Sequence, residues 1–248
     1  MNTSLLGIAA VGLVLGMRHA TDPDHVVAVT TIVAQQRSVR RAAAIGALWG
    51  TGHTLTILLV GGGIILFQWV IPVRLGLSME FSVALMLILL GLLNLRGFGE
   101  WRRSLVPQSA EHGHPHPHRH DDAALLAPLD QRLGGFAAYR PLRPLLIGIV
   151  HGLAGSAAVA LLVLATIRDP RWGIAYLLIF GLGTVVGMML ITSAIAAPFA
   201  VVGSREVRLQ RALRFASGAL SLLFGCWVAW RIGIVDGLFT AHPLWTPE

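Results

Sequence analysis

The sequence predicts an all-α integral membrane protein with six transmembrane helices, arranged as a 3+3 inverted repeat. Three observations predict this fold class. Of the 248 residues, 55% are hydrophobic and 12% are charged, whereas soluble domains carry about 25% charged residues. Six long apolar stretches follow one another along the chain, and motifs from the first three recur in the last three. We treat residues 1–248 as one membrane domain.

The six apolar stretches are long enough to cross a bilayer once each. They cover residues 4–34, 42–71, 79–98, 144–167, 172–202 and 212–235. A spanning helix needs about 20 apolar residues. Stretches of about 30 residues exceed the roughly 30 Å hydrocarbon core and must tilt, project or break. We expect local breaks at Pro23 and at the glycine run 61–63.

The arginines predict how the chain is oriented. All 19 basic residues are arginine, and twelve lie in 35–41, 99–143 and 203–211, against three on the opposite face. Because cytoplasmic loops are rich in basic residues, we expect the loop 99–143 in the cytoplasm and both termini outside. The expected location is a cell membrane, plasma or inner. The net charge of +7 then reflects arginines that set the orientation of the chain in the membrane, and no nucleic-acid partner is expected.

Composition excludes several kinds of chemistry. Without lysine, the chain has neither a Walker A phosphate loop nor a lysine Schiff base. The single cysteine, Cys226, rules out an internal disulfide and a multi-thiolate metal site. Residues 1–4 carry no basic side chain, so we expect no cleavable signal peptide.

Short motifs recur at offsets of 131 to 134 residues. The matched pairs are 16–19 with 148–151, 49–53 with 180–184 and 90–92 with 224–226. Because three spans is an odd number, the second copy, about 144–235, should be inverted relative to the first, about 1–98. Inverted repeats are a common transporter plan, with the substrate site near the midplane. The alternative is that glycine-rich apolar helices simply look alike.

Ionisable residues interrupt the first apolar stretch in the run Arg18-His19-Ala20-Thr21-Asp22-Pro23-Asp24-His25. A charge at bilayer depth costs about 2.5–3.5 kcal/mol on insertion scales, so this cluster should line a polar cavity or bind an ion. Two imidazoles with carboxylates suit Ni, Co, Zn or Cu(II), and not Cu(I). Arg18 is expected to pair with Asp22. A purely structural polar network is the alternative.

Helical geometry sorts the members of this cluster. On a continuous helix, His19, Asp22 and His25 share one face, whereas Asp24 falls on the other side. Pro23 removes a backbone hydrogen bond and disfavours helix at the residue before it. An unwound turn at this point can bring Asp24 inward.

Other polar residues lie in the apolar stretches. Small residues flank His53 and His151, which leaves room beside each imidazole. Either histidine is a candidate ligand or pathway residue, although a lone helical histidine is more often a satisfied core residue. We interpret Asn94 as a residue that forms a hydrogen bond between helices, and a role as a metal ligand or beside a metal is the alternative. Thr54 and Ser156 are further pathway candidates.

These motifs together resemble a known family. The run Arg18-His19-Ala20-x-Asp22-x-Asp24-His25 is similar to the His-x4-Asp-His signature of the nickel/cobalt transporter family. Gly52-His53-Thr54 and Gly91-x-x-Asn94 resemble that family's Gly-His-Ser/Thr and Gly-x-x-Asn elements. The stretch 151–156 has no acidic residue, whereas the best-known members carry Phe-Asp-Thr-Ala-Thr-Glu there. Those members have eight spans, so the chain resembles a shorter, six-helix branch.

The resemblance implies a high-affinity permease that takes up Ni²⁺ or Co²⁺ for metalloenzymes such as urease, without a prosthetic group or enzymatic activity. It implies that His19, Asp24 and His25 contact the metal, and the residues themselves add Asp22 and His53, with Arg18 beside the site. Expected partners are the metal ion, the lipid bilayer and a cytoplasmic metallochaperone, while the oligomeric state is left open. The alternatives are metal efflux, a metal-sensing membrane protein or an intramembrane metalloenzyme.

The predicted cytoplasmic loop contains a histidine-rich tract. Its five histidines alternate with other residues and with prolines that prevent a helix, and they are His112, His114, His116, His118 and His120. Such a tract is a flexible chelator of borderline divalent metals. We expect it to capture metal after passage or to regulate transport, with a solvated spacer as the alternative.

Overall fold

The structure is a computed structural model, and it describes residues 2–33, 36, 38–68, 71–104, 142–153, 167, 169–202 and 207–245. Within these ranges the chain is helical and contains no strand. The helices are α1 (Asn2–His19), α2 (Pro23–Val33), α3 (Val39–Phe67), α4 (Val73–Ser104), the unlabelled helix Leu142–Leu153, α7 (Pro170–Val202), α8 (Val207–Trp230) and the π-helix η2 (Arg231–Val235).

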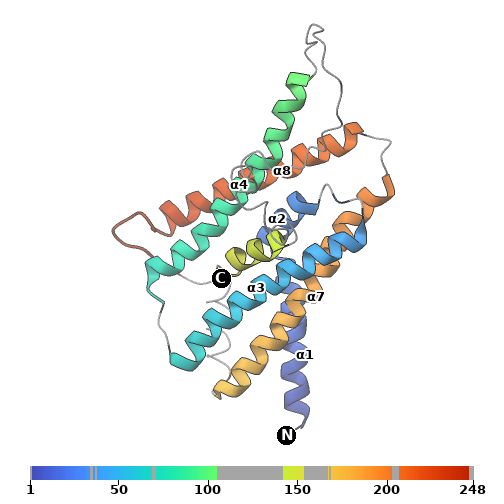
Figure 1. Cartoon of the computed structure of the whole chain (residues 1–248). Helices are drawn as coiled ribbons and strands as arrows, with labels where there is room; N and C mark the ends of the chain where they lie inside the picture. The colour runs from blue at the N-terminus through green and yellow to red at the C-terminus, as the bar shows by residue number, and fades with distance from the viewer. Residues whose placement is uncertain are drawn as a thin grey trace.

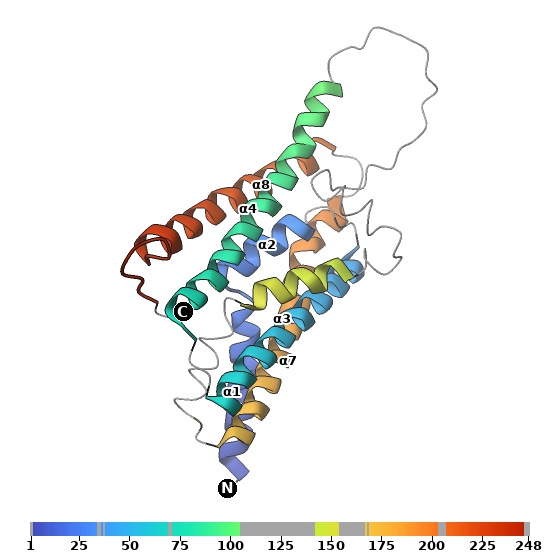
Figure 2. The ribbon, with the colours of Figure 1, turned by 60° about the vertical axis from the view of Figure 1, so that its left-hand side comes forward.

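The helices form two groups, with α2 between them (Figure 1). In the first group, α7 packs along both α1 and α3, and the helix Leu142–Leu153 lies beside α3. The second group is the pair of α4 and α8, which Figure 2 shows on the other side of the molecule. Because α2 contacts α4, α7 and α8, it joins the two groups.

Among the described residues, four helices are long and apolar enough to span a membrane. They are Val39–Phe67, Val73–Leu95, Pro170–Pro198 and Ala212–Val235. Two shorter apolar helices, Pro23–Val33 and Leu142–Leu153, accompany them. Large apolar side chains on the outer surface, such as Leu59 at 67% and Leu223 at 70% exposure, suit contact with lipid. The predicted all-helical membrane class is confirmed.

The first apolar stretch breaks at the predicted place. α1 ends at His19 and α2 begins at Pro23. Proline suits the first position of a helix, since it has no N–H to leave unpaired and its φ is already helical. The Asp22 carbonyl accepts from the N–H of Val26 at 3.0 Å, which opens the first turn of α2.

The second predicted break, at the glycine run 61–63, is wrong. α3 continues unbroken from Val39 to Phe67, and all three glycines are buried. A Cβ built on Gly62 would meet Ile174 of α7 at 3.6 Å, an ordinary contact, so α7 packs against this segment. Tertiary packing therefore outweighs the weak helix propensity of glycine.

One buried core joins α2, α3, α4 and α7. The fully buried Trp49 of α3 belongs to it, together with Val29 and Val33 of α2, Leu87 of α4 and Met188 of α7. This core fixes α2 against the two groups of helices, and it sets where the polar run 18–25 can lie.

Glycines bring the two halves of the chain together in a reciprocal pattern. Gly16 of α1 lies against the carbonyl of Phe180 in α7, and Gly148 lies against the carbonyl of Trp49 in α3. The two contacts are equivalent in the repeat, because Gly16 matches Gly148 at an offset of 132 residues and Trp49 matches Phe180 at an offset of 131. The same holds for the pairs Gly52 with Leu145 and Gly183 with Leu13, and for Gly91 with Leu222 and Gly225 with Ile88. A Cβ at any of these glycines would collide with backbone atoms.

Candidate metal centre

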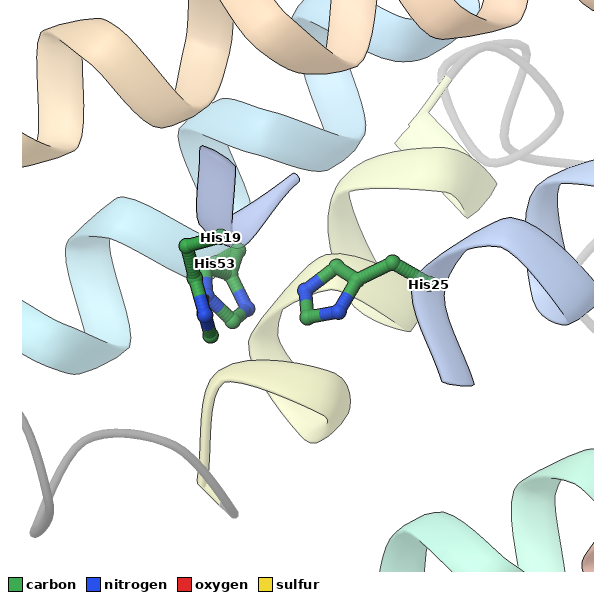
Figure 3. A group of neighbouring side chains, drawn as sticks. All are labelled: His19, His25 and His53. Carbon is green, nitrogen blue, oxygen red and sulfur yellow. Dashed lines mark hydrogen bonds between the residues drawn. The ribbon is translucent and has the colours of Figure 1, made fainter. Parts of the chain in front are cut away.

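Three imidazoles from three helices meet at the junction between α1 and α2. His19 ends α1, His25 lies in the first turn of α2, and His53 lies in the middle of α3. Figure 3 shows the rings of His19 and His53 side by side, with the tip of the His25 ring directed towards them. One ring nitrogen from each lies within 4.8 Å of those of the other two. The Nε2 atoms of His19 and His53 are 3.0 Å apart and share a hydrogen bond.

These imidazoles are buried with nitrogens left unsatisfied. His25 is 2% exposed and His53 is 0% exposed. Nε2 of His25 and Nδ1 of His53 have no hydrogen-bond partner among the described residues. Buried polar atoms in native proteins are almost always paired, so such atoms call for a functional explanation. A bound cation supplies the missing partner for a nitrogen lone pair.

A second group of potential ligands shares His25 with the first. Oδ1 of Asp24 lies 3.1 Å from Nδ1 of His25, and its Oδ2 lies 3.0 Å from Nε2 of His151. The ligand atoms of these three residues also lie within 4.8 Å of one another. His151 is 1% exposed, and its Nδ1 has no hydrogen-bond partner in the described part of the chain. The Asp24 carboxylate therefore connects α2 with the helix Leu142–Leu153.

The break before α2 explains why Asp24 faces the other polar residues. A continuous helix would place Asp24 and His25 on different sides. Instead, α1 ends at His19 and α2 starts in a new direction at Pro23, so both side chains reach the same cluster. This is the unwound turn that the sequence predicts.

Asp22 pairs with His19 rather than with Arg18. Oδ2 of Asp22 lies 2.6 Å from Nδ1 of His19. The predicted ion pair between Arg18 and Asp22 is wrong: among the described residues the two form no salt bridge, and Arg18 is exposed. Because α1 ends at His19, the two residues do not lie one turn apart on a continuous helix.

Two aromatic rings form apolar walls for the cluster. The His25 ring stacks on Trp49 with centroids 6.2 Å apart and an interplanar angle of 17°. The same Trp49 meets His151 edge-on at 5.5 Å, and Phe180 lies 5.5 Å from His19. The backbone carbonyls of Trp49 and Phe180 also contact Gly148 and Gly16, which belong to the opposite half of the chain. The same two residues therefore contact the imidazoles and the backbone of the other half of the chain.

A cavity of about 510 Å³ opens beside the cluster. On one side it is lined by His19, Asp22, Pro23, Asp24, His25 and His151. Its other walls come from α4, α8, η2 and the C-terminal segment, and they include Glu80, Arg231 and Asp236. Nε1 of Trp245 donates to Glu80 at 2.8 Å, and Arg231 lies 3.8 Å from Asp236. A cavity of this volume is large enough to hold a small hydrated ion beside the cluster.

The other candidate residues lie elsewhere. Thr54 donates from Oγ1 to the carbonyl of Gly181 at 3.1 Å and links α3 to α7. Asn94 donates from Nδ2 to the carbonyl of Thr31 at 3.0 Å and links α4 to α2. Neither residue lines the cavity beside the cluster. The remaining candidates lie outside the described residues: Ser156, His112, His114, His116, His118 and His120.

The sequence patterns predict neither the contact between Asp24 and His151 nor the acidic residues across the cavity. The match of His151 with His19 in the repeat was the available signal for the contact. For Glu80, the signal was a carboxylate at the start of an otherwise apolar stretch. Asp236 follows the last apolar stretch and carries no comparable signal.

Buried imidazoles and a carboxylate beside a cavity, within an all-helical membrane fold, are the arrangement expected of a metal-ion transport protein. The chain belongs to the family described as high-affinity nickel-transport protein, whose model matches residues 5–235. Membership makes it a nickel-transport permease rather than an enzyme.

Related proteins extend this result. The chain is 36% identical over 235 residues to the urease accessory protein UreH of Bacillus sp. (strain TB-90), covering 95% of this chain and 96% of that protein. It is 25% and 26% identical to the chloroplast proteins FOR GROWTH AND FERTILITY 1 and 2 of Arabidopsis thaliana. These matches cover 94% and 91% of this chain, and 60% and 56% of the plant proteins. No solved structure matches the chain.

Proposed function

We propose that this chain is a secondary permease that takes up Ni²⁺, with Co²⁺ as a second substrate, across a plasma or inner membrane. The observation that carries the proposal is the convergence of His19, His25 and His53 from three helices beside a cavity. Imidazole nitrogen suits both metals. The relationship to a urease accessory protein supports inward transport, since an enzyme inside the cell needs its metal delivered there.

We assign the first ion position to the three imidazoles, with Asp22 and Asp24 beside them. A metal–nitrogen bond is about 2.1 Å, so nitrogens at right-angled positions of a square-planar or octahedral ion lie about 3.0 Å apart. The Nε2 atoms of His19 and His53 have this separation, 3.0 Å. The carboxylates accept from Nδ1 of His19 and His25, which orients both rings and leaves each Nε2 for the ion.

We further propose that the chain has six spanning segments in two inverted repeats of three. The reciprocal contacts of Gly16 with Phe180 and of Gly148 with Trp49 support this arrangement. Inverted-repeat transporters hold their substrate near the midplane and expose it to each side in turn. His19 and His151, which match in the repeat, approach His25 with ring centroids at 4.8 and 4.2 Å.

The arginine distribution supports a cytoplasmic loop 99–143 and external termini. In this orientation the cavity walls at Glu80 and Asp236 lie towards the outside, because residues near 72–78 and 236–248 are external. Glu80 and Asp236 outnumber Arg231 among the charged residues of these walls, and a net negative charge there concentrates cations ahead of the imidazoles. On the cytoplasmic side, the histidine-rich tract then receives the ion and passes it to a metallochaperone.

Flux measurements in proteoliposomes test this function. The purified chain should carry Ni²⁺ and Co²⁺ into vesicles faster than Zn²⁺ or Mn²⁺, followed with a metal-sensitive dye inside. His19→Ala and His25→Ala should abolish the flux, because each removes a ligand from the ion. His242→Ala, an exposed histidine of the C-terminal segment, is the matched control. Equal accumulation with wild type and both site variants would contradict the proposal.

Two further readouts use the same vesicles. Flux should fall in acid medium, because protons compete with the metal for imidazole and carboxylate. Reversing the metal gradient and the orientation of the protein distinguishes uptake from efflux. A flux that rises on acidification would contradict ligation by these groups.

A further inference from the structure

His25 belongs to both groups of potential ligands. The tip of its ring, Nε2, is directed towards His19 and His53 (Figure 3). Its Nδ1 lies 3.1 Å from Asp24, whose other oxygen lies 3.0 Å from His151. The imidazole therefore stands between two ligand sets, with one nitrogen facing each.

We propose a second nickel position next to the first, formed by Asp24, His25 and His151, which receives the ion from the first position during transport. This inference rests on the proposed function of nickel transport. A carboxylate oxygen with two imidazole nitrogens is a ligand set that Ni²⁺ accepts. His151 is 1% exposed, and its Nε2, the atom that faces Asp24, has no hydrogen-bond partner among the described residues, as its Nδ1 has none. An ion between Asp24 and His151 would supply the missing partner for Nε2.

The two positions are occupied one at a time. A neutral imidazole offers a single lone pair, on Nε2 for the first position and on Nδ1 for the second, so His25 cannot serve both positions together. When the ion moves to the second position, the ring proton moves from Nδ1 to the vacated Nε2. Two divalent ions this close also repel strongly in surroundings of low dielectric constant. Occupation of one position therefore empties the other, and the shared residue makes the transfer a short step.

The two positions depend on different parts of the fold. The first needs His19, which lies before the turn 20–22, together with residues from α2 and α3. The second uses Asp24 and His25 of α2, with His151 on a helix held against α3. That helix is fixed by Gly152 against the His53 carbonyl and by Thr56 Oγ1, which donates to the Ile149 carbonyl at 3.0 Å. If the turn 20–22 changes conformation, His19 can therefore move away from the first position while the three residues of the second position stay together.

The test compares equilibrium binding with flux in full-length variants. All variants are made in a background in which the loop histidines are replaced by alanine, so that these residues do not bind metal. The replaced residues are His112, His114, His116, His118 and His120. His151→Ala should change the nickel Kd by less than about threefold and slow nickel flux at least tenfold. His53→Ala should weaken binding and flux together, and His242→Ala should change neither.

Two results would overturn the second position. Nickel flux within twofold of wild type in His151→Ala would show that the ion does not need it. A loss of binding as large as in His53→Ala would make His151 a ligand of a single site. If His151→Ala does not fold, His151→Gln, which keeps a polar side chain of similar size, is judged by the same two criteria. Absence of nickel flux with wild type would instead refute the proposed function.

Discussion

The two halves of the chain share their packing but differ in their chemistry. Gly16 and Gly148 occupy matched positions and make matched contacts with the carbonyls of Phe180 and Trp49. The polar residues do not match in this way. Where the first half has His53, the second has Thr184, which is fully buried and donates to the Phe180 carbonyl of its own helix at 3.0 Å. Among the described residues of the second half, only His151 joins the groups of potential ligands.

This difference shows that matched glycine contacts in the two halves do not require matched polar residues. Contacts between backbones need small residues in both halves, because a Cβ at either glycine would collide with a carbonyl. An ion needs only one set of ligands, and they must converge at one place. Asp24 connects the two halves, since its carboxylate reaches His25 on one side and His151 on the other.

The sharpest test of chemical asymmetry compares His53→Ala with Thr184→Ala. Loss of the imidazole should weaken nickel binding at least about 100-fold, more than the 10–100-fold typical of residues that only support a ligand. Thr184→Ala should change the nickel Kd by less than about threefold, because its hydroxyl bonds within α7. Isothermal titration in the loop-histidine-free background measures both. Equal losses would mean that the second half contributes ligands equally.

Asp24→Asn tests the link between the halves. Asparagine keeps the shape but loses the negative charge beside two imidazoles, and nickel affinity should fall about 10–100-fold. Asp22→Asn should cost less, since Asp22 contacts one imidazole and is more exposed, at 44% against 31% for Asp24. The same titration decides the order. A larger loss in Asp22→Asn would show that contact with both halves is unimportant.

The shared packing predicts matched losses of stability. Gly16→Ala and Gly148→Ala should each destabilise the protein by about 1–3 kcal/mol, because the added methyl must displace backbone. Gly62→Ala is the control, since its Cβ would make an ordinary 3.6 Å contact and alanine favours the helix. Thermal unfolding in detergent, followed by circular dichroism, gives the comparison. Loss in only one half would break the proposed symmetry.

Thr54→Val should have the smallest effect. It removes the hydrogen bond from α3 to the Gly181 carbonyl in α7, and such bonds in membrane proteins contribute about 0.6 kcal/mol on average. Thr51→Val is the control, because Thr51 is exposed and donates to the Ala47 carbonyl of its own helix. A drop in Tm with Thr54→Val and none with Thr51→Val is expected. Nickel flux should be unchanged in both.

Much of the site was predictable because it depends on local chemistry. Histidines and carboxylates within an apolar stretch are costly unless they have a function, so the run 18–25 pointed to an ion site without any knowledge of the fold. Pro23 predicted the break between α1 and α2 for an equally local reason, its missing N–H. Length and hydropathy predicted the helical membrane class.

Only the tertiary structure decided which of these groups meet. Whether Arg18 or His19 pairs with Asp22 depends on where α1 ends, and whether Asp24 reaches His151 depends on contacts between segments more than a hundred residues apart. The glycine run 61–63 stays helical because α7 packs along it, which no local propensity reveals. The sequence by itself determined the chemistry of the run 18–25 and the helical membrane class, since these follow from side chains and short spacing. Packing decided the arrangement of the ligands, because convergence is a property of several helices at once.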